Sequence, residues 1–179
     1  MRKSIIGLLV TASVVGVATA SVAPLHLSSP TLHVGSPAPK IEVGKWVKGT
    51  PVTQFKKGHV YVVEFWATWC PPCREAIPHM TELAKKYKKI TFIGVSIAEN
   101  NQAAVAPFVK MMGSKMVYHV AMDKQKSPTR GEGYMSDHWM VAAQQDGIPT
   151  AFIIGKDEHI KWIGSPFSIA PVLSKISKS

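Results

Sequence analysis

The stretch 59–67 is apolar at nearly every position, and Glu64 is the one acidic side chain inside it. A strand in the middle of a parallel sheet has this pattern, because both of its faces are covered by other elements. The stretches 90–97 and 116–122 are similarly apolar and predict two more buried strands. Together these three segments predict the centre of one sheet.

The segments between and after these strands favour helices. Pro78 lies inside the first of them, where it removes a backbone hydrogen bond and kinks the helix. Gly113 ends the second, and Ser136 is a suitable N-cap for the third. The four predicted helices span about 72–88, 101–112, 136–145 and 168–178.

The remaining apolar segments predict hairpins. Residues 150–154 and 160–163 read as two strands joined by a tight turn, and 41–53 as a short irregular hairpin around Lys48-Gly49. The predicted order is β-α-β-α-β-α-β-β-α. This order predicts the α/β class, with a central mixed sheet flanked by helices and an antiparallel hairpin at its edge.

The first residues follow a different pattern. Arg2 and Lys3 precede an apolar run at 5–17, and Ala18-Thr19-Ala20 has the small-residue pattern that signal peptidase accepts. We therefore predict a signal peptide at 1–20, a linker at 21–39 and a single domain at 40–179.

A retained membrane anchor is the alternative to cleavage. The stretch 4–22 is nearly long enough to span a bilayer, although serine, threonine and glycine dilute its hydrophobicity. In that case the membrane would be contacted through the N-terminal segment only. Both readings place the domain in the periplasm or an equivalent extracytoplasmic space.

The chain is basic, with 21 Lys and Arg against 11 Asp and Glu and a net charge of +10. Nucleic acid is not an expected partner, because no arginine cluster interleaves with aromatic residues. The lysines instead occur in separate pairs, as on solvated faces: Lys56-Lys57, Lys85-Lys86 and Lys88-Lys89.

The two cysteines, Cys70 and Cys73, are separated by Pro71 and Pro72. A disulfide across so short a loop would stabilise the fold very little, so the pair fits redox chemistry or metal binding better. Cys70 lies where the first strand meets the first helix, and a helix N-terminus favours a thiolate. Cys73, one turn later, can attack the mixed disulfide that Cys70 forms. The prolines leave few N–H donors for the thiolate, which favours a reducing centre.

The string Glu64-Phe65-Trp66-Ala67-Thr68-Trp69-Cys70-Pro71-Pro72-Cys73, with Pro78, resembles the active-site segment of thioredoxins, most closely of the TlpA/ResA/CcmG group. Gly147-Ile148-Pro149-Thr150 is similar to the cis-proline loop of that family, and Gly164 follows at a matching place. The resemblance covers about 34–176 and implies a thioredoxin fold. The long interval between the motifs implies the helix–strand insertion of the TlpA-like group before the cis-proline loop.

The resemblance also implies roles for individual residues. It implies a cis bond before Pro149, whereas the residue alone would equally fit a trans proline that starts a strand. Ile148 would then lie beside the disulfide, where its backbone can pair with an extended substrate. Trp69 would shield the disulfide or contact partners. The residues predicted to contact substrate are Trp69, Pro71, Pro72, Ile148, Pro149 and Thr150.

Glu64 occupies the place where thioredoxins have a buried aspartate, so the resemblance implies that it relays the proton of Cys73. TlpA-like proteins often have a glutamate three residues after the second cysteine, and this chain has Ala76 there. A solvated glutamate near the end of a strand is the alternative. We predict Cys70, Cys73 and Glu64 as the catalytic residues.

These observations predict an extracytoplasmic thiol–disulfide oxidoreductase that reduces disulfides of exported proteins, for example in cytochrome c maturation. Its electrons would come from a membrane protein. No cofactor beyond the Cys70–Cys73 disulfide is expected, and the scattered histidines predict no metal site. The alternative is a metallochaperone that binds copper(I) through the two cysteines.

Overall fold

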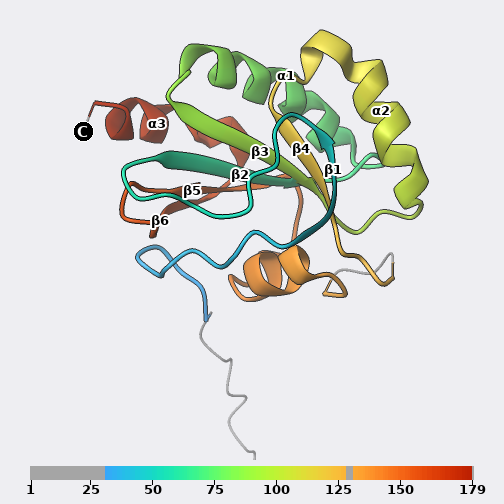
Figure 1. Ribbon diagram of the computed structural model, residues 1–179, viewed down its shortest axis with the longest axis horizontal. Helices are drawn as coiled ribbons and strands as arrows, with labels where there is room; N and C mark the ends of the chain where they lie inside the picture. The colour runs from blue at the N-terminus through green and yellow to red at the C-terminus, as the bar shows by residue number, and fades with distance from the viewer. Residues whose placement is uncertain (1–30, 128–130, 179) are drawn as a thin grey trace, which may run out of the picture.

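The computed structural model describes residues 31–127 and 131–178. A six-stranded sheet in the order β1-β4-β3-β2-β5-β6 forms its centre (Figure 1). Strands β2, β3 and β4 are parallel, and β1, β5 and β6 are antiparallel to their neighbours, so the predicted mixed sheet is confirmed. The strands are β1 (Val43–Lys48), β2 (Val60–Trp66), β3 (Ile90–Ser96), β4 (His119–Asp123), β5 (Thr150–Ile154) and β6 (Ile160–Gly164).

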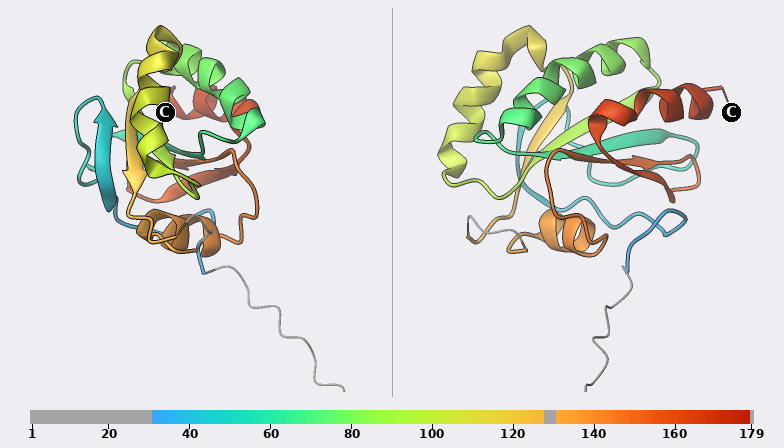
Figure 2. Two further views of the ribbon diagram at one scale, coloured as in Figure 1. Left: turned by 90° about the vertical axis from the view of Figure 1, so that its right-hand side faces the viewer. Right: turned by 180° about the vertical axis from the view of Figure 1, so that it is seen from behind.

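Helices cover both faces of the sheet. Figures 1 and 2 show the α-helices on one face of the sheet and the π-helical segment η3 (Ser136–Val141) on the other. The three helices are α1 (Pro71–Lys86), α2 (Val105–Met112) and α3 (Ala170–Ile176). Between β3 and β5 the chain forms α2, β4 and η3, and their interpretation as the TlpA-like insertion stays a prediction.

Strand β2 lies in the middle of the sheet and is buried along its whole length, as its apolar pattern predicted. Val62 and Trp66 pack with α1, whereas Val63 and Phe65 pack with the η3 side. Because side chains alternate along a strand, Glu64 faces the α1 side with Val62 and Trp66.

The predicted hairpin at 41–53 is wrong. Only β1 forms there, and it pairs antiparallel with β4 at the sheet edge. Gly49 ends the strand with a φ of 76°, and Pro51 has no N–H for a second ladder. The partner of β1 is therefore a distant strand rather than the segment that follows it.

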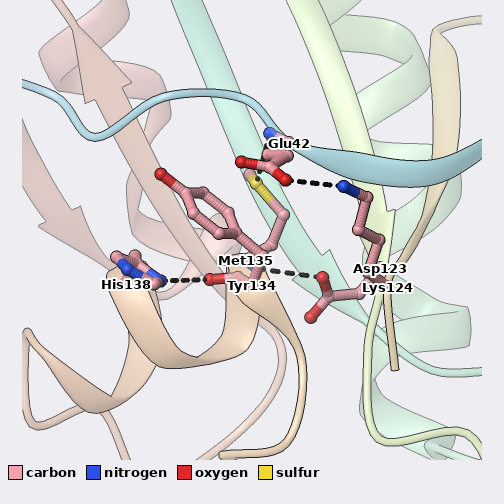
Figure 3. A network of polar contacts seen from close by, with 6 residues as sticks. All are labelled: Glu42, Asp123, Lys124, Tyr134, Met135 and His138. Carbon is pink, nitrogen blue, oxygen red and sulfur yellow. Dashed lines mark hydrogen bonds and ion pairs between the residues drawn. The ribbon is translucent and has the colours of Figure 1, made fainter. Parts of the chain in front are cut away.

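Ser136 does not cap its helix as predicted. The Asp123 carboxylate accepts hydrogen bonds from the N–H groups of Met135 and Ser136, both at 2.9 Å. Figure 3 shows Asp123 reaching this turn from the end of β4. The Ser136 hydroxyl instead accepts from the Gly131 N–H. Burial raises the pKa of Asp123, and the hydrogen bonds from these N–H groups oppose that effect.

The folded unit begins before residue 40, where the predicted linker ended. Leu32 is buried, and its N–H donates to the carbonyl of Ala142 at 3.0 Å. Gly35 donates to the carbonyl of Ile160 at 2.8 Å, so residues 32–39 pack along β6 and η3. The predicted signal peptide and residues 21–30 lie outside the described residues. Within 31–127 and 131–178, no helix is long and apolar enough to cross a membrane.

Candidate active site

Cys70 and Cys73 form a disulfide where β2 leads into α1, with a Cα–Cα distance of 5.3 Å. Cys70 is the N-cap of α1, and its Sγ accepts a hydrogen bond from the Cys73 N–H at 3.2 Å. Pro71 and Pro72 occupy the first helical positions, where no intrahelical N–H bond is lost. The helix N-terminus thus points its positive end at Cys70, as the sequence predicted.

The disulfide is covered by the surrounding protein. Cys70 is only 2% exposed and Cys73 is fully buried. The Sγ of Cys70 lies 3.7 Å from the carbonyl oxygen of Ile148. The disulfide therefore lies between the start of α1 and the loop that contains Ile148.

That loop has the predicted cis bond between Ile148 and Pro149. The Thr150 hydroxyl donates to the Gly147 carbonyl at 2.7 Å and closes the loop. Thr150 also pairs with Phe65 near the end of β2, which brings the loop to the disulfide. The structure thus places Cys70, Ile148, Pro149 and Thr150 together.

Trp69 forms part of the rim of the site. Its side chain is 47% exposed, and its Nε1 donates to the Ala98 carbonyl at 2.8 Å. Pro71 and Pro72 are exposed beside it. These three residues present an apolar surface next to a covered disulfide, and their contact with substrate stays a prediction.

Glu64 is completely buried, so the alternative of a solvated glutamate is wrong. The Tyr118 hydroxyl donates to its Oε2 at 3.1 Å, and its Oε1 has no partner among the described residues. Burial raises the pKa of Glu64 to about 8, although the Tyr118 hydrogen bond opposes this rise. A carboxyl with this pKa exchanges protons near neutral pH.

Sequence reasoning missed Tyr118, which lies beside Glu64 across the sheet. Gly94 lies in β3, between Glu64 of β2 and the start of β4, which Tyr118 directly precedes. A Cβ at position 94 would come within 2.9 Å of the Tyr118 ring. Gly94 therefore leaves the space that the ring fills. Burial and the neighbouring Glu64 both raise the pKa of Tyr118, so it remains a hydrogen-bond donor.

Sequence reasoning also missed Thr68, Arg74 and Glu99. Glu99 follows β3 and accepts hydrogen bonds from Thr68, just before the disulfide. Arg74 of α1 donates from Nε to the Thr68 carbonyl at 2.7 Å. The sequence did hold one signal, since parallel neighbours end at the same edge of a sheet and Glu99 comes soon after such an end.

Metal ligands are sparse around the site. Across the described part of the chain, no group of three or more His, Cys, Asp and Glu side chains is arranged to hold a metal ion. The site brings together two cysteines, a helix N-terminus and a buried acid.

Comparison with known proteins agrees with this geometry. The Redoxin family model matches residues 33–176. The chain is 30% identical to Protein FixW of Rhizobium leguminosarum over 82% of this chain and 66% of FixW. It is 32% identical to the thiol-disulfide oxidoreductase ResA of Bacillus cereus, over 73% of this chain and 75% of ResA.

A solved structure, the thiol:disulfide interchange protein of Chlorobium tepidum, is similar with a TM-score of 0.57 and 28% identity. The match covers 80% of this chain and 97% of that one. The chain therefore belongs to the Redoxin family and is a thioredoxin-fold thiol–disulfide oxidoreductase of the TlpA/ResA/CcmG type.

Proposed function

We propose that this protein is a dithiol reductant of disulfides in exported proteins, with Cys70 as the attacking cysteine and Cys73 as the resolving one. The observation that carries the proposal is the position of Cys70. Its Sγ caps α1, accepts the Cys73 N–H and lies beside the cis-proline loop. A thiolate at this point is stabilised, and thiolates are the nucleophiles of disulfide exchange.

The reaction has two exchanges. In the reduced protein, the Cys70 thiolate attacks one sulfur of the substrate disulfide, and the other substrate sulfur leaves as a thiolate and takes up a proton. Cys73 then loses its proton and attacks the Sγ of Cys70, which releases the second substrate thiol. The substrate gains two electrons, and the protein is left with the Cys70–Cys73 disulfide.

Glu64 is the proposed proton acceptor for Cys73. It faces the α1 side of β2, where Cys73 belongs to the same packed cluster as Val62 and Trp66. Its pKa of about 8 suits a general base at neutral pH. The position three residues after Cys73, where TlpA-like proteins often have a glutamate, is Ala76 here and provides no second acid near Cys73.

The reducing direction is supported by the two prolines. Pro71 and Pro72 have no N–H groups to donate to the Cys70 sulfur. Among the hydrogen bonds of the described residues, the Cys73 N–H is the one donor to that sulfur. A thiolate with few donors is only moderately stabilised, and strong oxidants depend on a strongly stabilised thiolate. We therefore propose net flow of electrons toward the substrate.

The proposed substrates are exported proteins with disulfides. Among them are apocytochromes c, whose haem-binding cysteines would be reduced. An extended substrate segment would lie across the loop at Ile148 and Pro149, with Trp69 and the exposed prolines as apolar contacts. The protein would act in the periplasm or an equivalent space and receive electrons from a membrane protein. The membrane would be contacted through the N-terminal segment where that segment is retained.

The test follows the two cysteines separately in the reduced protein with a peptide disulfide. Cys70→Ser should abolish reduction, whereas Cys73→Ser should accumulate a mixed disulfide on Cys70. Mass spectrometry of proteins trapped on Cys73→Ser in the native host would identify the substrates. A mixed disulfide found on Cys73 instead would reverse the assignment, and tight copper(I) retention without disulfide reduction would support the metallochaperone.

A further inference from the structure

The turn between β2 and α1, residues 67–70, is held by a carboxylate from the neighbouring strand. Glu99 lies just beyond the end of β3, which is the parallel neighbour of β2, and it is only 3% exposed. Its Oε1 accepts the Thr68 N–H at 2.7 Å, and its Oε2 accepts the Thr68 hydroxyl at 2.6 Å. The Ser96 hydroxyl also donates to Oε1. Three donors thus converge on one buried carboxylate.

Glu99 is itself fixed in place. The Gln125 side chain, just after β4, accepts the Glu99 N–H through Oε1 and donates to the Glu99 carbonyl through Nε2, both at 2.8 Å. The neighbouring Ala98 adopts a φ of 52°, and its carbonyl accepts the Trp69 indole N–H. The segment 96–99 therefore holds both residues that precede Cys70.

Losing these hydrogen bonds would leave the Thr68 N–H and hydroxyl without their partner in a partly buried environment. Thr68 is two residues from Cys70, and the geometry of attack on a disulfide depends on where the Cys70 sulfur points. We propose that Glu99 is a positioning residue, which fixes the Thr68–Trp69 turn and thereby orients Cys70 for attack. The proposal rests on the proposed function and adds a residue that does not touch the sulfur atoms.

Two substitutions separate positioning from charge. Glu99→Gln keeps the shape, since its amide oxygen can accept from the Thr68 N–H and Ser96 while its nitrogen donates to the Thr68 hydroxyl oxygen. Glu99→Leu has a similar volume and removes every one of these hydrogen bonds. Glu82→Leu is the matched control, because it removes an exposed carboxylate paired only with Lys85 among the described ion pairs.

Two measurements are made on each variant. The rate of mixed-disulfide formation with a peptide disulfide is measured in the Cys73→Ser background. The hydrogen exchange of the Thr68 amide is measured by NMR relative to that of Val62 in β2, so that global unfolding cancels. We expect Glu99→Leu to slow attack about 10- to 100-fold and to raise relative Thr68 exchange at least about 10-fold. Glu99→Gln and Glu82→Leu should stay within about 3-fold of the parent.

An attack rate in Glu99→Leu within two-fold of the parent would overturn the proposal. So would a Glu99→Gln variant as slow as Glu99→Leu, because the carboxylate charge would then matter rather than its hydrogen bonds. Where Glu99→Leu does not fold, Thr68→Val and Ser96→Ala each remove one hydroxyl donor to Glu99. If both variants keep the parent's attack rate and the parent's amide exchange at position 68, the proposal is likewise overturned. A parent that attacks no disulfide would refute the proposed function alone, since Thr68 exchange still tests the hold of Glu99 on the turn.

Discussion

Glu64 makes the stability of this protein depend on pH in a way that can be isolated with one substitution. Its pKa is about 8 in the folded protein, against an ordinary value of 4.5. The folded state therefore keeps a proton that the unfolded state loses between these two values. The stabilisation from this proton is complete below pH 4.5 and is lost as pH rises toward 8.

The size of the effect follows from the interval. At about 1.4 kcal/mol per pH unit, the free energy of unfolding should fall by as much as about 5 kcal/mol between pH 4.5 and 8 because of Glu64. Structural relaxation around the charged form lowers this figure, so a loss of about 2–5 kcal/mol is expected. Glu64→Gln keeps an acceptor for the Tyr118 hydroxyl and removes the titration.

The assay is chemical denaturation of the disulfide-bonded parent and Glu64→Gln from pH 4 to 9.5. Asp123 has a raised pKa and His119 a lowered one, so both also change stability with pH. They are present in both proteins, and their effects cancel in the difference. We expect Glu64→Gln to gain on the parent steadily from about pH 5 to 8 and then to level off. A difference that is independent of pH would refute the raised pKa of Glu64, and with it the proposed proton transfer from Cys73.

Further predictions concern the partners of Glu64, the start of η3 and the N-terminal segment. Tyr118→Phe removes a hydrogen bond to the carboxylate, so the upper limit of the pH range over which stability is lost should rise by about one unit, with no such change in a Glu64→Gln background. Asp123→Ala leaves two backbone N–H groups without a partner and should lower stability by about 2 kcal/mol, as measured by denaturation at pH 7. Glu64→Gln should slow resolution of the mixed disulfide about 100-fold or more in stopped-flow measurements, whereas an unchanged pH profile would exclude Glu64 as the base. Protein exported from its native host should begin at Ser21 by intact-mass analysis, and full-length chain in the membrane fraction would contradict cleavage.

The parts of the site that could be predicted are those encoded by neighbouring residues. Cys70 and Cys73 are three positions apart, and the apolar run before them defines β2, so the strand, the helix start and the disulfide follow from one continuous segment. The cis bond at Pro149 was implied by the resemblance of a second short motif to the cis-proline loop of thioredoxins. The strand and the helix start could be predicted from the residues alone because residues close together in the sequence determine them.

The residues that were missed interact across the sheet. Tyr118 meets Glu64 from 54 positions away, and Glu99 meets Thr68 from 31 positions away. Asp123 caps η3 from another element in the same manner. Apolar periodicity predicts which face of a strand is buried, but it contains no information about which strand lies beside it. The wrong hairpin at 41–53 has the same cause, because β1 pairs with β4 rather than with its sequence neighbour.

The sheet order explains why Thr68 and Glu99, two of the missed residues, meet next to the disulfide. Strands β2, β3 and β4 are parallel neighbours, so Thr68, Glu99 and Gln125 follow successive strand ends and meet at one edge. Strand β5 runs the opposite way and brings Pro149 to that edge from the other side. Support for Cys70 therefore comes from the loops, whereas Glu64 lies within β2 and reaches the α1 face from inside the sheet.

The buried acid of this chain lies in β2 rather than on the active-site helix. The glutamate that the TlpA-like group often has on the active-site helix would lie one turn from the second cysteine, and here that position is Ala76, fully buried. The Glu64 side chain inside β2 is completely buried, so its pKa depends strongly on the few polar groups that touch it. Among the described residues the one such group is the Tyr118 hydroxyl. Because Gly94 makes room for the Tyr118 ring, a larger residue at position 94 would push against that ring, displace its hydroxyl and change the proton affinity of Glu64, although Glu64 and Tyr118 themselves are unchanged in the sequence.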